Sequence, residues 1–136
     1  PQESRLFASR KAHPTWIIHG ADVEKEKKQL WTGAGAKLLE TTSISGIISI
    51  KSALGNLASE GLTSVYCEGG SQLAACLLSN NLVDELIIFT AGVLIGDDGL
   101  PTIASLGVNE LKDAKRLNLL DSVALDGDIM TRWSLK

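Results

Sequence analysis

The sequence is poor in the residues that nucleic-acid and membrane-surface binding require. Aromatic residues make up 4% of the 136 residues, and the formal net charge at pH 7 is -3. Proteins that bind nucleic acid or anionic lipid usually present a basic surface, and those that bind single strands add aromatic side chains on which bases stack. A nucleic-acid or membrane partner is therefore not expected.

Long apolar runs are also missing. No stretch approaches the roughly 18 to 20 apolar residues that a membrane-spanning helix needs. The N-terminal sequence PQESRLFASRK lacks the apolar core of a signal peptide and reads as a polar arm. These absences predict a soluble, cytoplasmic protein.

Cysteine and histidine are too scarce for a recognisable metal site. Cys67 and Cys76 lie in apolar runs and are too far apart for a CxxC pair, so reduced, structural thiols are predicted. Only His13 and His19 can be added to them, and no zinc-binding spacing results. No metal is therefore expected.

The sequence does contain an alternation of strand-like and helix-like segments. Hydrophobic residues make up 44% of the chain, which suits one globular domain with a core. Compact β-prone runs predict strands, and apolar residues at helical spacing predict helices. The predicted order is a strand at 15–19, a helix capped by Asp22 and reaching Leu30 or Trp31, a strand at 36–40, a helix from Ile50 that stops at Gly61, a strand at 64–67, and a helix at 71–78 capped by Ser71.

That order implies parallel strands joined by crossover helices, and the pattern then changes. A strand is predicted at 85–90, followed by an irregular stretch at 92–107. Asp126-Gly127 lies between two β-prone runs and predicts a hairpin. The expected fold is α/β, with a mixed sheet in which parallel strands flanked by helices precede a C-terminal antiparallel hairpin.

The segment Glu68-Gly69-Gly70-Ser71 lies between a predicted strand and a predicted helix. Ligands of open α/β sheets bind at the carboxyl ends of parallel strands, beside helix N-termini that favour anions. Two glycines allow close approach of the backbone to a phosphate, and Ser71 adds a hydroxyl group. An ordinary helix start beside a solvated Glu68 remains the alternative, because neither GxGxxG nor a P-loop pattern is present.

Residues Val65 to Gly96, VYCEGGSQLAACLLSNNLVDELIIFTAGVLIG, resemble the C-terminal reductase domain of the bacterial riboflavin-biosynthesis deaminase/reductase. The matching features are a strand, EGGS, Leu-Ala in a short helix, LVDEL, and a strand that ends near a Leu-Leu-Gly sequence. The resemblance implies a fold similar to dihydrofolate reductase. It also implies NADPH-dependent reduction of 5-amino-6-(5-phosphoribosylamino)uracil to the ribitylamino product, by a homodimer with its apolar C-terminal strands near the contact.

The resemblance also assigns roles to individual residues. It implies that Glu68 contacts the pyrimidine substrate and that Gly69 supports the turn. The residues implied to lie against NADPH are Gly70, Ser71, Gln72, Leu73, Ala74, Ala75 and Cys76. No catalytic nucleophile is expected, because the hydride chemistry belongs to the cofactor.

The resemblance covers only part of the family's domain. The family's first strands, which carry a Ser-x-Asp-Gly-like segment and further ligand contacts, would precede Pro1. The chain is therefore expected to be the C-terminal part of a single reductase domain, residues 1–136, and to be inactive alone. Two alternatives stay open: a dihydrofolate-reductase-like oxidoreductase that acts on another heterocycle, and a non-enzymatic domain that keeps the fold.

Three further features receive structural interpretations. Asp97 and Asp98 have no third ligand and predict a polar turn rather than a metal site. His19 ends a strand where a cofactor would bind; a hydrogen-bonded surface residue is favoured, with a ligand role as the alternative. The tryptophans are expected to serve as core or interface anchors: Trp16, Trp31 and Trp133.

Overall fold

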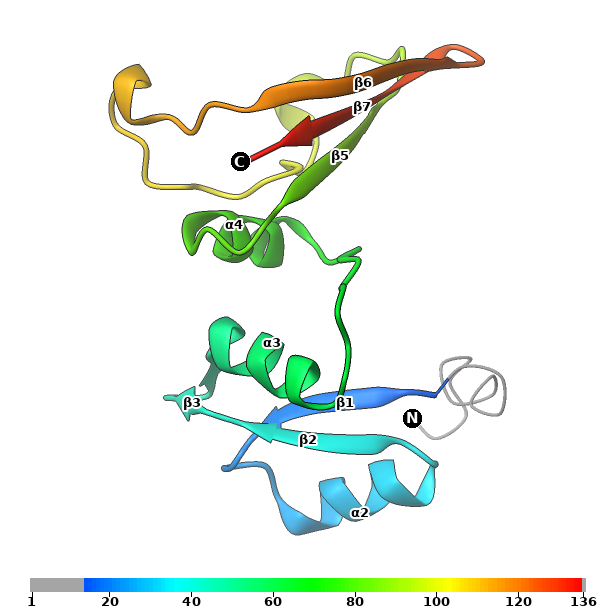
Figure 1. The fold of residues 1–136 in the computed structure, drawn as a ribbon, viewed down its shortest axis with the longest axis vertical. Helices are drawn as coiled ribbons and strands as arrows, with labels where there is room; N and C mark the ends of the chain where they lie inside the picture. The colour runs from blue at the N-terminus through cyan, green and yellow to red at the C-terminus, as the bar shows by residue number, and fades with distance from the viewer. Residues whose placement is uncertain (1–13, 136) are drawn as a thin grey trace. The chain divides into compact units, whose positions relative to one another are not determined.

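The computed structural model describes residues 14–135, so that the N-terminal arm and His13 lie outside the described residues (Figure 1). The chain divides into two compact units, and the division falls between Val65 and Tyr66. The α/β class is confirmed, and both the parallel and the antiparallel strand pairs that the sequence predicts are present.

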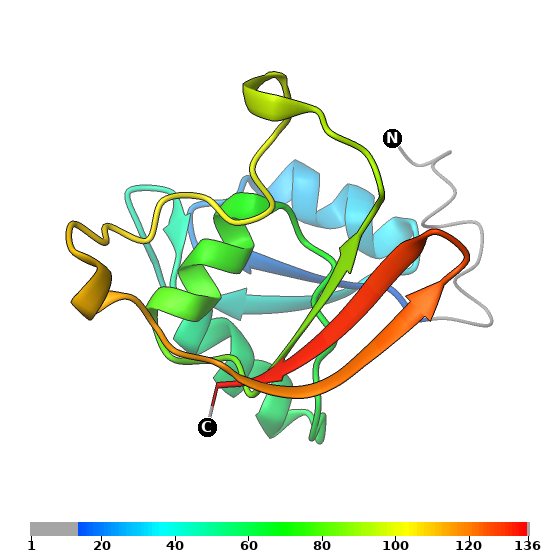
Figure 2. The same ribbon diagram turned by 90° about the horizontal axis from the view of Figure 1, so that it is seen from above.

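The first unit is built on two parallel strands. β1 (Trp16–Gly20) pairs with β2 (Lys37–Thr41), and α2 (Lys25–Gly33) connects them. α3 (Ile50–Ser59) follows, and the two helices cover opposite faces of the strand pair (Figures 1 and 2). The carboxyl ends of β1 and β2 therefore lie side by side between two helices.

α2 begins later than the sequence predicts. Its N-cap is Glu24, and no side chain caps it. Asp22, the predicted cap, instead accepts a hydrogen bond at Oδ1 from Ser43 Oγ at 3.2 Å. A tertiary partner thus replaces the local capping interaction that the sequence favours, and the predicted N-cap was wrong.

α3 agrees with its prediction at both ends. Ser49 is the N-cap, and its side chain accepts a hydrogen bond from the Ser52 backbone N–H at 3.3 Å. Gly61 follows the helix with a φ of 89°, the left-handed conformation that glycine adopts without penalty. A short hairpin that the sequence did not predict precedes α3: β3 (Ser43–Ile44) and β4 (Ile47–Ile48).

The second unit contains one helix and an antiparallel sheet. α4 (Ser71–Ser79) is followed by β5 (Glu85–Thr90), β6 (Asn118–Leu125) and β7 (Asp128–Ser134). The strand order is β5-β7-β6, so β5 and β6 form the two edges of this sheet. Short 3-10 turns at Gly96–Asp98 and Leu111–Asp113 interrupt the connection between β5 and β6, which the sequence predicts to be irregular in its first part.

The predicted C-terminal hairpin is confirmed. Asp126 and Gly127 join β6 to β7 with φ values of 46° and 98°. Positive φ at both central residues is the conformation of a type I′ turn, which matches the twist of the flanking strands.

The strand predicted at 64–67 is not formed. Residues 62–70 belong to no helix or strand, and every residue from 61 to 70 is exposed. A β-prone run becomes a strand only when its backbone groups pair with a neighbouring strand, and residues 64–67 have no such neighbour in the described structure. Within residues 14–135 the hydrogen-bonded strand groups are the parallel pair β1-β2, the hairpin β3-β4 and the antiparallel sheet β5-β7-β6.

The core of each unit is made of small or medium-sized side chains. In the first unit the buried hydrophobic residues are Ala34, Ala36, Leu39 and Ala53, and in the second they are Ala75, Leu77 and Leu78. Ile17, Trp31 and Leu38 pack against the alanine pair Ala34 and Ala36. Trp31 thus helps to pack the first unit, as its proposed anchoring role requires.

Candidate functional site

The segment Glu68-Gly69-Gly70-Ser71 forms the exposed entry to α4. Gly70 is the N-cap, in an extended conformation with φ -71° and ψ 177°, and no side chain caps the helix. Ser71 is the first helical residue, so its predicted role as the cap was wrong. We call residues 68–73, from Glu68 to the end of the first helical turn, the α4 turn.

The two glycines of the α4 turn serve different purposes. A Cβ atom on Gly69 would lie 2.5 Å from Leu73 Cδ2, which means that a side chain there would collide with the helix. A Cβ atom on Gly70 would meet no atom within 4 Å. Neither glycine has a positive φ. A side chain at Gly69 would therefore displace the Leu73 side chain, whereas the space in front of Gly70 is open to a ligand.

The first turn of α4 offers backbone donors to an anion. The first intrahelical hydrogen bond runs from the Ala74 N–H to the Gly70 carbonyl oxygen at 3.1 Å. The N–H groups of Ser71, Gln72 and Leu73 precede it and have no acceptor within the helix. Together with the helix dipole they favour a phosphate or carboxylate in front of Gly70.

The remaining residues implied to contact a cofactor differ in accessibility. Gln72, Leu73 and Cys76 are exposed, and Ser71 and Ala74 are half-buried. Ala75 is only 5% exposed, and Leu77 and Leu78 of the same helix are also buried, so the Ala75 side chain is not open to a direct contact. The Ala104 N–H donates to the Ser71 carbonyl oxygen at 3.1 Å, which fastens the loop after β5 to this helix.

The different packing of the two glycines yields a stability prediction. We expect Gly69→Ala to lower the free energy of unfolding by about 1 kcal/mol, because Leu73 must move away from the new methyl group. Gly70→Ser, which places a good N-cap residue in open space, should not lower it. Urea unfolding followed by circular dichroism measures both variants, and equal losses would show that the two glycines are equivalent.

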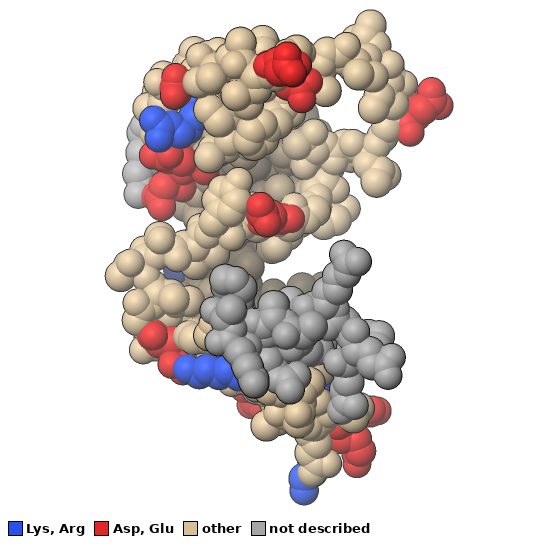
Figure 3. All heavy atoms as spheres, turned by 90° about the vertical axis from the view of Figure 1, so that its right-hand side faces the viewer, with Lys and Arg blue, Asp and Glu red and all other residues tan. Residues whose placement is uncertain are grey.

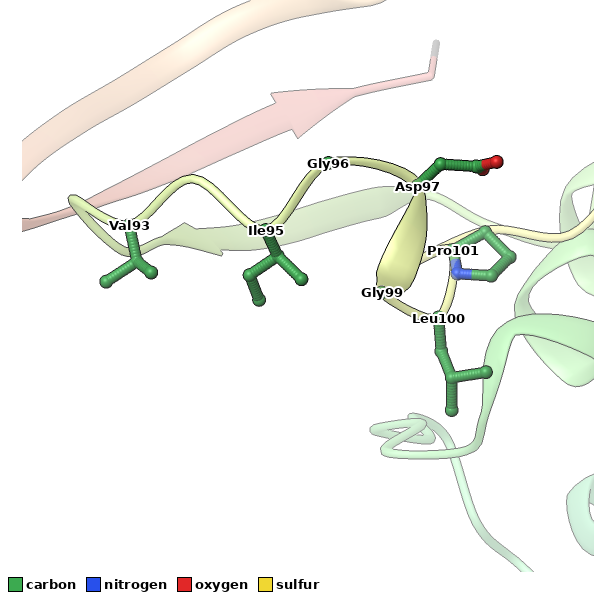
Figure 4. Close-up of a pocket in the computed structure, with 7 residues that line it drawn as sticks. All are labelled: Val93, Ile95, Gly96, Asp97, Gly99, Leu100 and Pro101. Carbon is green, nitrogen blue, oxygen red and sulfur yellow. The ribbon is translucent and has the colours of Figure 1, made fainter.

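A hollow lies on the loop after β5. It has a volume of about 460 Å³ and is lined by residues between Val93 and Pro101. The side chains of Val93, Ile95 and Leu100 point to one side of the loop, and the Asp97 carboxylate points away from them (Figure 4). This open hollow offers no converging polar side chains. The turn predicted at Asp97 and Asp98 corresponds to the 3-10 turn there.

The first unit holds a polar pocket at the carboxyl ends of β1 and β2. Its volume is about 390 Å³. It is lined by Ala21, Glu40, Thr41, Thr42, Ser52 and Asn56. Sequence reasoning pointed to this edge of the strands only through His19 and did not single out these residues. The sequence contains one signal that points to them: the hydroxyl-bearing residues Thr41, Thr42 and Ser43 at the end of a parallel strand.

His19 lies beside this pocket but is not the surface residue that the sequence favoured. It is 5% exposed, and its Nδ1 lies 2.8 Å from the Gly20 carbonyl oxygen. Glu40, opposite His19 on β2, accepts a hydrogen bond from Lys28 Nζ at 2.9 Å. This hydrogen bond and the charge of Lys28 hold the pKa of the Glu40 carboxyl below its ordinary value.

Charge and metal-binding groups are dispersed. Basic side chains occupy separate places on the face shown in Figure 3 and form no continuous patch there. Among residues 14–135, no three His, Cys, Asp or Glu side chains lie close enough together to hold a metal ion. Within the same residues, no helix is long and apolar enough to cross a membrane.

Comparison with protein families identifies the family to which the chain belongs. The model of the RibD C-terminal domain matches residues 1–131. The chain belongs to this family. The resemblance stated for residues Val65 to Gly96 is thereby confirmed.

Individual members of the RibD C-terminal domain family are similar over much of the chain. The riboflavin biosynthesis protein RibD of Bacillus amyloliquefaciens is 34% identical over 121 residues, which cover 87% of this chain and 32% of that protein. The 2,5-diamino-6-ribosylamino-4(3H)-pyrimidinone 5′-phosphate reductase of Methanothermobacter thermautotrophicus is 32% identical over 77 residues, 56% of this chain and 36% of that protein. The chain thus spans about a third of the length of these relatives.

Solved structures support the same fold. Acinetobacter baumannii RibD superposes with a TM-score of 0.74 at 21% sequence identity, over 98% of this chain and 34% of that one. A pyrimidine reductase-like protein from Corynebacterium diphtheriae also gives a TM-score of 0.74 at 21% identity, over 98% of this chain and 56% of that one. At this level of identity the similarity establishes the fold.

Proposed function

We propose that this RibD C-terminal domain takes part in the reduction of 5-amino-6-(5-phosphoribosylamino)uracil to its ribitylamino product, a step of riboflavin biosynthesis. The observation that carries the proposal is the open α4 turn, Glu68 to Leu73, in a chain that matches the family over residues 1–131. Relatives named for reduction of a pyrimidine or pyrimidinone phosphate support the substrate class.

The α4 turn fits the phosphates of a nicotinamide cofactor. Three backbone N–H groups without helical partners precede Ala74, and no side-chain cap occupies the helix N-terminus. When bound, the cofactor supplies a hydride to the substrate. NADPH is the form that the family resemblance implies. The chain's own contribution is to hold the phosphates and thereby to orient the cofactor.

Glu68 is proposed to bind the pyrimidine. It is exposed directly before the two glycines, and a carboxylate can accept hydrogen bonds from ring and exocyclic N–H groups. The remaining binding residues named from the resemblance follow it in the α4 turn and in α4. The buried Ala75 is proposed to contribute through packing alone.

A reductase assay tests the proposed function. A protein that contains this domain is mixed with the aminopyrimidine phosphate and either NADPH or NADH, and the nicotinamide absorbance is followed. Loss of absorbance that depends on the pyrimidine is expected. Cofactor binding without any response to the pyrimidine would favour a reductase of another heterocycle, and binding of neither ligand would favour a non-enzymatic domain. That residues 1–136 are inactive alone stays a prediction.

We also propose a homodimer in the cytoplasm. β6 is an edge strand, and its exposed apolar residues include Leu119, Val123 and Leu125. Cys67 and Cys76 are free, as in a reducing compartment. The assembly itself is predicted from the family resemblance, and the exposed β6 supports the expected place of contact.

Light scattering at micromolar concentration should give twice the 14.4 kDa mass of the monomer. Val123→Lys should shift the protein to the monomer, because it places a charge on the face of β6 that holds the exposed Val123 and Leu125. Ser122→Lys, on the opposite face of the same strand, should not. A monomer in the unmodified protein would contradict the dimer.

A further inference from the structure

The long connection between β5 and β6 is fastened to both ends of α4. At the start of the helix, the Ala104 N–H donates to the Ser71 carbonyl oxygen at 3.1 Å. Beyond the end of the helix, Lys115 Nζ donates to Asn81 Oδ1 at 2.5 Å. All four residues belong to the second unit, which extends from Tyr66 to the C-terminus. Residues 104–115 are therefore anchored to the helix that carries the α4 turn.

The bond between Ala104 and Ser71 is the better shielded of these two anchors. Both of its residues are half-buried, whereas Lys115 and Asn81 are exposed. A hydrogen bond that is partly shielded from water is electrostatically stronger than one in full contact with it. Ala104 therefore holds the loop at the end of α4 where the phosphate donors lie.

The carbonyl group that Ala104 holds belongs to the same peptide group as the Gln72 N–H. A peptide group is planar and trans, so its C=O and N–H bonds point in opposite directions. A donor that fixes the Ser71 carbonyl oxygen thus also fixes the direction of the Gln72 N–H. This N–H is one of the three in the first turn that have no acceptor within the helix. It lies directly after Gly70, where the space is open.

The same bond also makes the Gln72 N–H a stronger donor. Hydrogen bonds that follow one another through a peptide group polarise that group, which strengthens each bond of the chain. A carbonyl oxygen has two lone pairs, so the Ser71 oxygen can accept from Ala104 and still take part in the helix. The chain of bonds would run from the Ala104 N–H through the Ser71–Gln72 peptide to an anion in front of Gly70.

We infer that Ala104 is a positioning residue of the proposed phosphate site. Its N–H group holds the Ser71–Gln72 peptide so that the Gln72 N–H points toward a phosphate of the cofactor. The inference rests on the proposed function, because it assumes that the α4 turn binds these phosphates. Ala104 acts through Ser71, so its N–H group matters and its methyl group does not.

The first test removes the N–H group. NADPH and the aminopyrimidine phosphate are titrated separately into the Ala104→Pro form of the protein used in the reductase assay, since proline has no N–H to donate. NADPH affinity should fall about three- to tenfold, because one hydrogen bond and its polarising effect are lost. Affinity for the pyrimidine should change little.

Two variants serve as matched controls. Ala104→Gly removes the methyl group and keeps the N–H. Leu94→Pro places a proline in the same connection, at a fully exposed residue outside every helix and strand. Both should leave NADPH affinity unchanged. A general loosening of the fold would lower the affinity for both ligands, so the ratio of the two affinities separates positioning from a merely structural role.

The second test needs no variant and therefore also applies if Ala104→Pro fails to fold. Coupling between two interactions is reciprocal, so NADPH must strengthen the bond that favours its own binding. Hydrogen exchange of the Ala104 amide, followed by NMR, should slow several-fold when NADPH is added. The Leu135 amide is the control, because it donates to the Asp84 carbonyl oxygen at 3.1 Å in the same unit. Its exchange should slow less.

The outcomes separate this inference from the proposed function. Unchanged NADPH affinity in folded Ala104→Pro, an equal loss for both ligands, or no greater slowing at Ala104 than at Leu135 would overturn the inference. Failure of the unmodified protein to bind NADPH would overturn it as well. NADPH binding that weakens in Ala104→Pro, without pyrimidine-dependent oxidation of NADPH in the unmodified protein, would refute the proposed reductase and leave the positioning role in place.

Discussion

Replacing Gly70 with valine should abolish binding of the nicotinamide cofactor while the domain stays folded. Gly70 has an ordinary extended backbone, and a Cβ atom there would meet no protein atom within 4 Å. The branched side chain would instead fill the space in front of the N–H groups of Ser71, Gln72 and Leu73. A phosphate could then no longer approach these donors closely.

Isothermal titration calorimetry with NADH and NADPH measures the loss, and circular dichroism reports the fold. Valine is a poor N-cap, so a stability loss of about 1 kcal/mol is expected. Gly70→Thr separates the two effects, because threonine can cap the helix and still blocks the approach. Gly55→Val places the same side chain in open space on α3 and should leave cofactor affinity unchanged. Unchanged affinity in folded Gly70→Val would remove the α4 turn as the phosphate site.

Replacing Glu68 with glutamine should weaken pyrimidine binding about ten- to a hundredfold and leave cofactor binding nearly unchanged. A hydrogen bond to a charged group contributes more than one between neutral groups, and glutamine keeps the size of the side chain while it removes the charge. Glu68 is exposed and precedes the helix, so the fold should not depend on it.

The aminopyrimidine phosphate and the cofactor are titrated separately into the Glu68→Gln protein. Glu110→Gln is the control, because Glu110 is an exposed carboxylate of the same unit, far along the chain from the α4 turn and paired with Lys112 at 2.7 Å. Equal losses for both ligands in Glu68→Gln would identify Glu68 as part of the helix start rather than as a pyrimidine contact.

Most of the regular elements could be predicted from local sequence. The β5 strand has the predicted bounds, and α3 begins at the predicted Ile50 and ends before Gly61, as its apolar spacing indicates. The hairpin at Asp126-Gly127 also follows from its turn residues. These features depend on interactions among residues that are close in the sequence, which is why a local pattern suffices to predict them.

The errors occur where a distant residue decides the outcome. Asp22 does not cap α2, because Ser43 bonds to its carboxylate. The run at 64–67 is β-prone but remains outside any strand, because no neighbouring strand pairs with it in the described structure. His19 is buried, although its place at the end of a strand suggested the surface.

The sequence by itself determined the α/β class and the order of most elements, because both follow from the spacing of apolar residues. It also determined the family and the position of the α4 turn, because both follow from the EGGS motif and the segment around it. Only the tertiary structure decided that Gly69 is held by Leu73 whereas Gly70 faces open space, and that Glu40 shares a polar pocket with Ser52 and Asn56. The physical reason is that accessibility and charge pairing depend on atoms that folding brings together from distant positions, such as the Lys28 ammonium beside Glu40.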